Sequence, residues 1–346
     1  MLESRVTVKA WQQVRQKHPD LGLRIFISTT TSERYFKVLA ELPEGVKVER
    51  ACATTLERVP CEPRDLLANP LLDHYAARGT WMASYDVPIA ANSCVNTPEF
   101  QVPESSPHRV RHTVRQLFNR KFQGAYGMNP FDKTDRICSM NIHALAEWSW
   151  NMNGRTEKEF AVAWATRQGY ARPELVGDWV EIMGPIEFDV YDSDFPVCYS
   201  WKKAVALVMD RKPPVLGEGM FRYYASPEAF DRKIADCDKA LALVEQLEPP
   251  DLANETRVVR SYVKLAKAIY QVAYDRFAAD ASASGTRELL KRDVEALAAA
   301  GRENVETIRA WRTAIGPEPW HHRVHDAMKA TEATVSEIAA IVAGEK

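Results

Sequence analysis

Strand patterns that alternate with helical patterns are the feature that most constrains how this 346-residue chain can fold. Short runs rich in β-branched and aromatic residues predict strands that begin near Arg24, Lys47, Thr80 and Gln123. Helical patterns lie between them, and consecutive βα units make parallel strands covered by helices. We therefore expect an α/β first half, either a partial (β/α)8 (TIM) barrel or a small doubly wound sheet.

The second half of the chain carries only helical patterns. Thr156 and Glu159 form a capping box that predicts the start of one helix, and Gly169 predicts its end. Beyond a proline-rich linker, four long patterns predict an up-and-down helical bundle. We therefore expect two domains, a partial barrel with post-barrel helices over residues 1–212 and an all-α C-terminal bundle over residues 213–346.

Four predicted strands are half of the number that a (β/α)8 barrel needs. An isolated half barrel would expose two unpaired strand edges and an open apolar face. We therefore expect this chain to be the second half of a barrel, completed by a complementing N-terminal segment or by another copy in a homo-oligomer. A nucleotide-binding doubly wound sheet has less support, because the sequence contains neither a G-x-G-x-x-G nor a G-x-x-x-x-G-K-[ST] motif.

Composition argues against several classes of function. Lys and Arg total 45 and Asp and Glu total 47, which gives a formal net charge of -2, so neither nucleic acid nor a membrane surface is an expected partner. The sequence as given predicts no spanning helix and no signal peptide, and it does not indicate a compartment. The cysteines form no C-x-x-C pair, and His321 and His325 are interpreted as a solvated helix end. No metal site and no cofactor are expected.

Polar and aromatic residues follow the predicted strands at their carboxyl ends, where barrel enzymes place their active sites. Glu49 and Asp86 are the available carboxylate pair, and glycoside cleavage commonly uses two such groups. The competing interpretation is that each carboxylate caps a helix or pairs with an arginine. Aromatic faces can pack on a pyranose ring. The strand-end residues expected to bind a sugar in this way, or through their polar groups, are Tyr85, Tyr126 and Asn129.

A further pair of candidates precedes the capping box. Trp148 and Trp150 are two residues apart and cannot both face one stripe of a helix, so one is expected in the core and the other on a cavity wall. Trp148 is placed in the substrate-binding set, with core packing as its alternative. Glu147 is expected either to hydrogen-bond a ligand or to pair with another side chain.

The segment 141–151, with the sequence NIHALAEWSWN, is followed by TEKEF at 156–160 and then by Trp164 and Ala165. This arrangement resembles the end of the barrel and the post-barrel helices of bacterial glycoside hydrolases of the β-N-acetylhexosaminidase and α-glucuronidase kind. The resemblance covers residues 23–210. It implies that the acid and base stand on an earlier strand than those in this chain. The residues that it assigns to the walls of the sugar subsite are Trp81, Tyr85, Asp86, Tyr126 and Glu147.

Three functions are therefore compared. The first is a glycoside hydrolase-like protein that binds or cleaves a carbohydrate. The second is a non-catalytic carbohydrate-binding or scaffolding protein that keeps the aromatic subsite without the acid and base. The third is a different αβ enzyme acting on a small metabolite, with the helical region as a dimerisation element.

Overall fold

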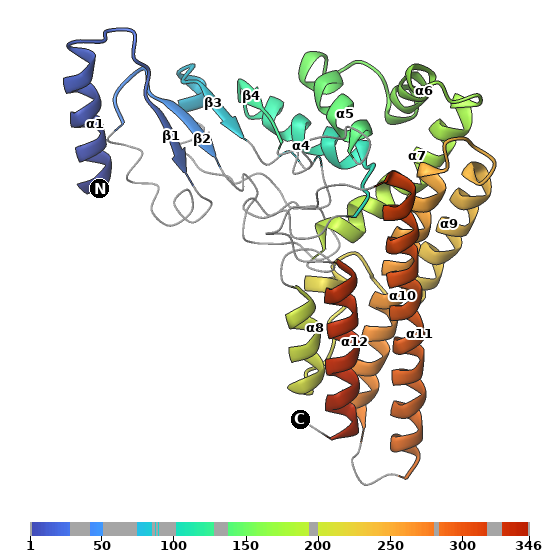
Figure 1. Ribbon diagram of the computed structural model, residues 1–346. Helices are drawn as coiled ribbons and strands as arrows, with labels where there is room; N and C mark the ends of the chain where they lie inside the picture. The colour runs from blue at the N-terminus through green and yellow to red at the C-terminus, as the bar shows by residue number, and fades with distance from the viewer. Residues whose placement is uncertain are drawn as a thin grey trace.

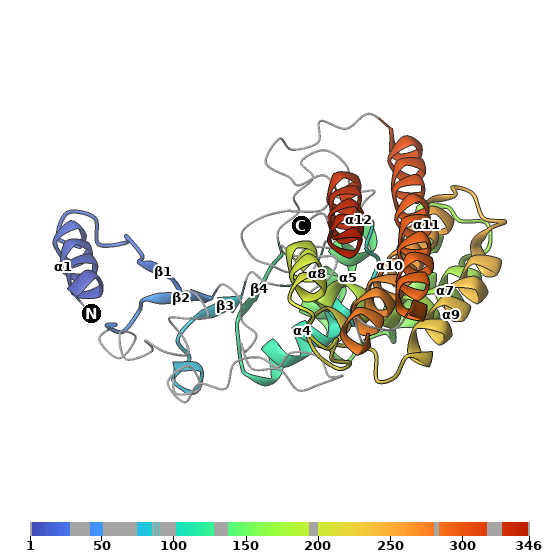
Figure 2. The same cartoon turned by 90° about the horizontal axis from the view of Figure 1, so that it is seen from below.

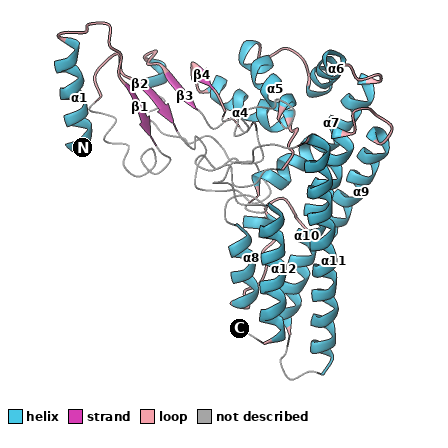
Figure 3. Cartoon of the chain, viewed as in Figure 1, coloured by secondary structure: helices cyan, strands magenta, loops and turns pink. Residues whose placement is uncertain are grey.

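The computed structural model combines a small parallel sheet with a larger set of helices (Figure 1). The chain is therefore α/β plus all-α, as the sequence predicts at this coarse level. Figure 3 shows how unevenly the two kinds of structure are distributed, with all four strands towards the N-terminal side of the molecule. The described residues are 2–27, 42–50, 75–84, 87, 89, 102–127, 138–193, 200–279, 284–316 and 327–344.

Every strand begins within two residues of its predicted start. The strands are β1 (Arg24–Ile27), β2 (Lys47–Arg50), β3 (Met82–Ser84) and β4 (Gly124–Ala125). They pair in the order β1-β2-β3-β4, and all pairs are parallel. A doubly wound sheet reverses its direction of growth at a switch point, whereas each strand described here is added beside the previous one.

The sheet has one apolar face. Ile27, Val48 and Met82 project from neighbouring strands and pack with Tyr75 and Ala76, which belong to a helical turn before β3. Strand side chains alternate between faces, so the intervening residues form the opposite face. The apolar face is the one expected to carry crossover helices, because right-handed connections between sequential parallel strands all pass over the same side of a sheet.

Helices dominate the rest of the described chain. α10 packs against α7, α8, α9 and α11, and α12 packs against both α8 and α11. Two views at right angles show the long helices α10, α11 and α12 side by side (Figures 1 and 2). The helix bounds are α1 (Leu2–Arg15), α4 (Pro107–Asn119), α5 (Ser139–Trp150), α6 (Glu157–Gln168), α7 (Pro173–Asp192), α8 (Ser200–Met209), α9 (Glu228–Val244), α10 (Asp251–Ala278), α11 (Ser284–Ile315) and α12 (Ala327–Ala343), with a 3-10 turn at Gly219–Phe221.

One continuous hydrophobic core, the helical-body core, runs through this part of the molecule from Val87 to Ile341. Trp179 of α7 is completely buried in it, and its indole N–H donates a 2.8 Å hydrogen bond to Oγ1 of Thr256 on α10. The predicted capping box is confirmed at the start of α6, where Thr156 and Glu159 bond reciprocally.

Helices α4 and α7 approach each other closely at Gly184. The Ser106 hydroxyl, at the N-cap of α4, donates a 2.7 Å hydrogen bond to the carbonyl oxygen of Gly184. A Cβ atom on residue 184 would lie 2.2 Å from Nδ1 of His108. The contact therefore requires glycine.

Some expectations differ from the structure in detail. α7 runs from Pro173 to Asp192 although Pro185 lies inside it, at a position where a proline ordinarily predicts a break. The sequence patterns do not predict α5 as a separate helix. The four described strands form an open sheet, so the partial barrel stays a prediction. Within the described ranges, every helix is either too short or too polar to cross a bilayer.

Candidate functional site

The sheet face opposite the apolar one carries charged and aromatic side chains, and we call it the polar face. Arg24 and Lys47 are register partners, and both cations lie over the ring of Trp81, at 5.2 and 5.3 Å from its centroid. The same ring lies across β4, because a Cβ atom on Gly124 would be 3.1 Å from it. The absence of a side chain at Gly124 thus lets the indole approach β4 closely.

Glu49 lies one layer closer to the carboxyl ends of the strands, on the same polar face. Its side chain is 8% exposed, and its Oε1 lies 2.7 Å from Nη1 of Arg24. This is the arginine pairing that competes with catalysis as an interpretation of this carboxylate. The pairing fixes the position of the Glu49 carboxylate on the polar face, and the catalytic role of Glu49 stays a prediction.

The other strand-end candidates divide into two groups. Tyr126 follows β4 directly, where its N–H donates to the Ser84 carbonyl and its own carbonyl accepts from Val87, so it extends the β3–β4 ladder. It is 38% exposed. Its place at the carboxyl end of the sheet agrees with expectation. The remaining predicted residues, Tyr85, Asp86 and Asn129, lie outside the described residues.

The two predicted residues on α5 belong to a separate place from the sheet. Trp148 is 1% exposed, packs against Phe160 with ring centroids 5.1 Å apart, and donates its indole N–H to the Arg155 carbonyl. Its position therefore corresponds to core packing, the alternative to substrate binding at this residue. Glu147 accepts two hydrogen bonds from Nη1 of Arg155, at 2.8 and 2.9 Å, so it is a paired carboxylate.

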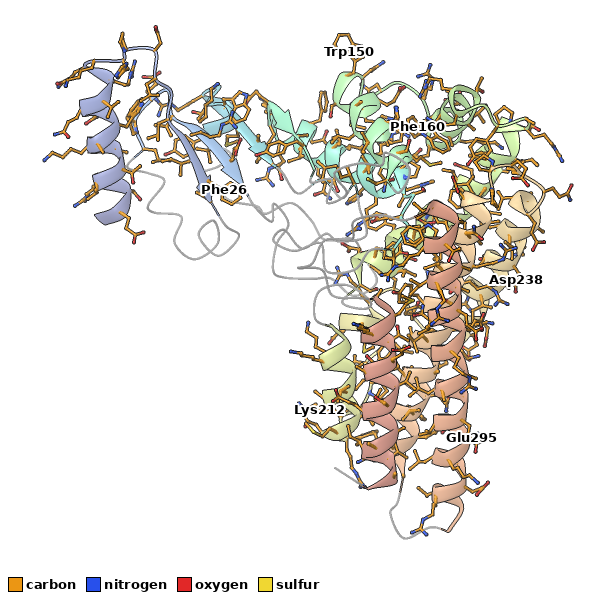
Figure 4. All side chains as sticks on the ribbon, in the orientation of Figure 1. Phe26, Trp150, Phe160, Lys212, Asp238 and Glu295 are labelled. Carbon is orange, nitrogen blue, oxygen red and sulfur yellow. The ribbon has the colours of Figure 1, made fainter. Side chains whose placement is uncertain are left out.

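An open groove of about 900 Å³ lies between the C-terminal end of α5 and the start of α6, and we call it the α5–α6 groove. Trp150 lines it and is 93% exposed, the opposite of Trp148. Figure 4 shows Trp150 projecting away from the helical body. Trp148 thus lies in the core and Trp150 in this surface groove, whereas the sugar-site cavity expected beside one of them stays a prediction.

The connection between β3 and α4 is fixed to the helical body by a buried polar network. Asn141 of α5 donates from Nδ2 to the carbonyl oxygens of Ile89 and Glu104, which lie on the two sides of this connection. Glu104 also receives a 2.9 Å hydrogen bond from Nη1 of Arg109. Arg109 faces a second carboxylate, that of Asp192, at 3.5 Å. Both ends of the connection are therefore anchored.

Two more carboxylates complete this network, which we call the carboxylate clamp. Ser105 donates its N–H to Glu187 of α7 at 2.6 Å and its hydroxyl to Glu255 of α10 at 3.1 Å. Burial raises the pKa of both carboxyl groups, well above its usual range for Glu187 and to about 8 for Glu255. Two neighbouring buried carboxylates cannot both ionise cheaply, so they hold a proton at neutral pH.

Neither the sheet nor the clamp offers a metal site. The described residues contain no group of three or more His, Cys, Asp or Glu side chains arranged to hold a metal ion. The clamp is also closed to ligands, because Glu187 is fully buried and Glu255 is 5% exposed. The clamp holds the backbone of residues 104 and 105 in place. The polar face and the α5–α6 groove, in contrast, have side chains that a ligand could contact.

No family model and no curated protein matches this chain. The resemblance to glycoside hydrolases therefore stays a prediction that rests on its own residues, chiefly 141–165.

The clamp is the feature that sequence reasoning missed, and of the two tryptophans it placed Trp148 rather than Trp150 in the substrate-binding set. Ser106 followed by Pro107 is a helix N-cap signal, and it could have drawn attention to the anchored residues just before α4. No comparable signal marks Glu187 or Glu255, because a glutamate in a helical pattern ordinarily predicts an exposed face. Their pairing depends on how α7 and α10 cross in space.

Proposed function

We propose that this chain is a glycoside hydrolase-like protein that binds or cleaves a carbohydrate. The observation that carries the proposal is the sheet itself, in which sequential parallel strands separate an apolar face from a polar face that bears Glu49 and Trp81. In a (β/α)8 barrel the crossover helices cover one face and the other becomes the interior. The polar face would then line the inside of a barrel.

The four strands would supply half of that barrel. The other half would come from a complementing N-terminal segment or from a second copy of this chain. The polar face supports this interpretation, because its charged and aromatic side chains suit the interior of a sugar-handling barrel better than a packed apolar core. The carboxylate clamp supports it too, since it fixes the β3–α4 connection, and such βα connections build barrel active sites.

In such a site, Trp81 would pack on the apolar face of a sugar ring while Glu49 accepts hydrogen bonds from its hydroxyl groups. Asp86 would supply the second carboxyl group required for hydrolysis. The Arg24–Glu49 ion pair favours a second candidate, a non-catalytic carbohydrate-binding protein, because the Glu49 carboxylate already has a partner on the neighbouring strand.

Hydrolysis of a panel of aryl glycosides by the whole chain tests the proposal, with Glu49→Gln and Asp86→Asn as variants. A glycosidase should lose at least about a hundredfold in rate with Asp86→Asn, which removes a general acid, base or nucleophile. The matched control is Glu174→Gln, which makes the same change of side chain at the exposed start of α7 and should leave the rate unchanged.

Thermal unfolding in the presence of the corresponding free sugars separates the two candidates. A sugar that raises the melting temperature without being cleaved would establish the non-catalytic alternative. Absence of both hydrolysis and stabilisation across the panel would overturn the carbohydrate proposal.

A further inference from the structure

The α5–α6 groove combines a single exposed aromatic ring with polar groups that are held in place. Trp150 is the last residue of α5, and the helix ends where the N–H of Asn151 bonds to the Glu147 carbonyl. An indole with 93% of its surface exposed is unusual for a large aromatic side chain. The groove beside it has a volume of about 900 Å³, within the range of sites for small molecules.

The polar groups around Trp150 are pre-ordered by bonds within the protein. Arg155 is held by both carboxylate oxygens of Glu147, and Glu159 accepts from the N–H and hydroxyl of Thr156. Ordered donors and acceptors lose little conformational freedom when a ligand binds.

His143 and Asn151 add groups of both kinds to the groove. The carbonyl of Ser139 can only accept, so Nδ1 of neutral His143 carries the hydrogen of their 2.8 Å bond, which makes Nε2 an acceptor. Asn151 uses Oδ1 to accept from the N–H of Asn153, and its amide nitrogen is a donor. Such mixed groups match sugar hydroxyls, each of which both donates and accepts.

Charge also indicates the class of ligand. The groove is lined by Arg155 and Arg167 and by Glu147 and Glu159, so its formal charges balance when histidine is neutral. An anionic ligand would gain little here. A protein partner would require a wider apolar centre, whereas Trp150 is the single aromatic residue other than His143 among the groove-lining residues that the structure describes.

We propose that the α5–α6 groove is a binding site for a neutral sugar unit of an oligosaccharide or polysaccharide, with Trp150 as the stacking platform. This site is separate from the polar face of the sheet, and it rests on the proposed function only for the chemical class of its ligand. It would hold a polymer on the outside of the protein while the barrel site acts on another part of it.

Affinity electrophoresis tests the proposal. The whole chain is run in native gels that contain soluble xylan, hydroxyethyl cellulose or glycol chitin, together with Trp150→Ala, Trp150→Phe and the control Phe118→Ala. Phe118 is a 60% exposed aromatic residue on α4 that does not line the groove. We expect at least one polysaccharide to retard the wild type. Trp150→Ala should then weaken binding about tenfold, Trp150→Phe less, and Phe118→Ala not at all.

Equal retardation of wild type and Trp150→Ala, or no retardation in any gel, would overturn the proposal. So would sedimentation that shows a dimer for wild type and a monomer for Trp150→Ala, because Trp150 would then cover a second copy. Failure of the barrel site is a separate result. It would appear as loss of aryl glycoside hydrolysis and of stabilisation by free sugars, neither of which requires the groove.

Discussion

The sheet region and the helical body differ in how much buried apolar surface supports them. The sheet rests on a cluster of five buried side chains, those of Ile27, Val48, Tyr75, Ala76 and Met82 among the described residues. The helical-body core is continuous from Val87 to Ile341. Because apolar burial is the main favourable term in folding, the body is expected to be stable by itself. The sheet is expected to depend on its neighbours.

The two regions also treat polar side chains differently. In the helical body, the carboxylate clamp buries its carboxyl groups, and Arg109 and Ser105 donate hydrogen bonds to them. In the sheet, Arg24, Lys47 and Glu49 share one face with aromatic side chains. A polar face on so small a sheet contributes little stability, which is consistent with a surface kept for binding.

The largest expected effect contrasts two tryptophans. Trp179→Ala removes a completely buried indole from the helical-body core, so the free energy of unfolding should fall by about 4 kcal/mol. The same substitution at the exposed Trp150 should change it by no more than about 0.5 kcal/mol. Urea denaturation followed by circular dichroism measures both. Similar losses for the two variants would contradict the division between core and groove.

Removal of the cation from the clamp tests how firmly the sheet region is tied to the body. Arg109→Met leaves Glu104 buried without its guanidinium partner and removes one of the two guanidinium groups beside Asp192, and we expect a loss of about 3 kcal/mol. The matched variant Lys158→Met breaks the exposed pair with Asp178 and should change the free energy of unfolding far less than Arg109→Met does. Chemical denaturation of both proteins gives the comparison. If Arg109→Met leaves the free energy of unfolding unchanged, then the clamp contributes no net stability.

Two fully buried methionines allow the same substitution in each region. Met183→Ala in α7 should lower the free energy of unfolding of the helical body by roughly 2.5 kcal/mol. Met82→Ala in β3 should instead speed hydrogen exchange in the strands and leave the unfolding midpoint of the body unchanged. Hydrogen exchange measured by mass spectrometry resolves the two regions. If Met82→Ala lowers the midpoint as much as Met183→Ala does, then the regions unfold as one unit.

A dependence of stability on pH is also expected from the clamp. The pKa of Glu255 is about 8 in the folded protein and near 4.5 in the unfolded chain, so folding takes up a proton between these values. The free energy of unfolding should therefore fall as the pH rises from about 4.5 to about 8. Glu255→Gln keeps the shape of the protonated acid and should flatten this slope.

Glu187→Gln should flatten the same slope, because the two carboxylates share the proton. Unfolding free energies measured at intervals from about pH 5 to about pH 9 provide the test. A slope in both variants that equals that of the wild type would show that the pair does not titrate in this range.

Local sequence patterns were sufficient for most of the elements but not for the site. The strand at Lys47 and the capping box at Thr156 were predictable because alternation and capping are properties of neighbouring residues. The end of α7 at Asp192 was not predictable, because Pro185 ordinarily predicts the end of a helix and α7 continues past it. The expected domain boundary at residue 212 stays a prediction.

The site required information on distant contacts. Glu49 was found from its position at a strand end, but its partner Arg24 became evident only from the β1–β2 register. Likewise, the sequence restricted Trp148 and Trp150 to opposite sides of a helix without showing which side faces the core. The buried side of α5 is the side on which Trp148 packs against Phe160, and Phe160 belongs to α6.

The contact at Gly184 has a consequence for any attempt to redesign this protein. A side chain at residue 184 would meet the ring of His108, and the Ser106 hydroxyl holds the Gly184 carbonyl, so the close approach of α7 to the start of α4 depends on these two side chains and on the glycine. Because α4 follows directly from the anchored Ser105, this contact helps to fix where the helix begins. Loops grafted between β3 and α4 could vary in length and composition while their downstream end keeps the same position and direction.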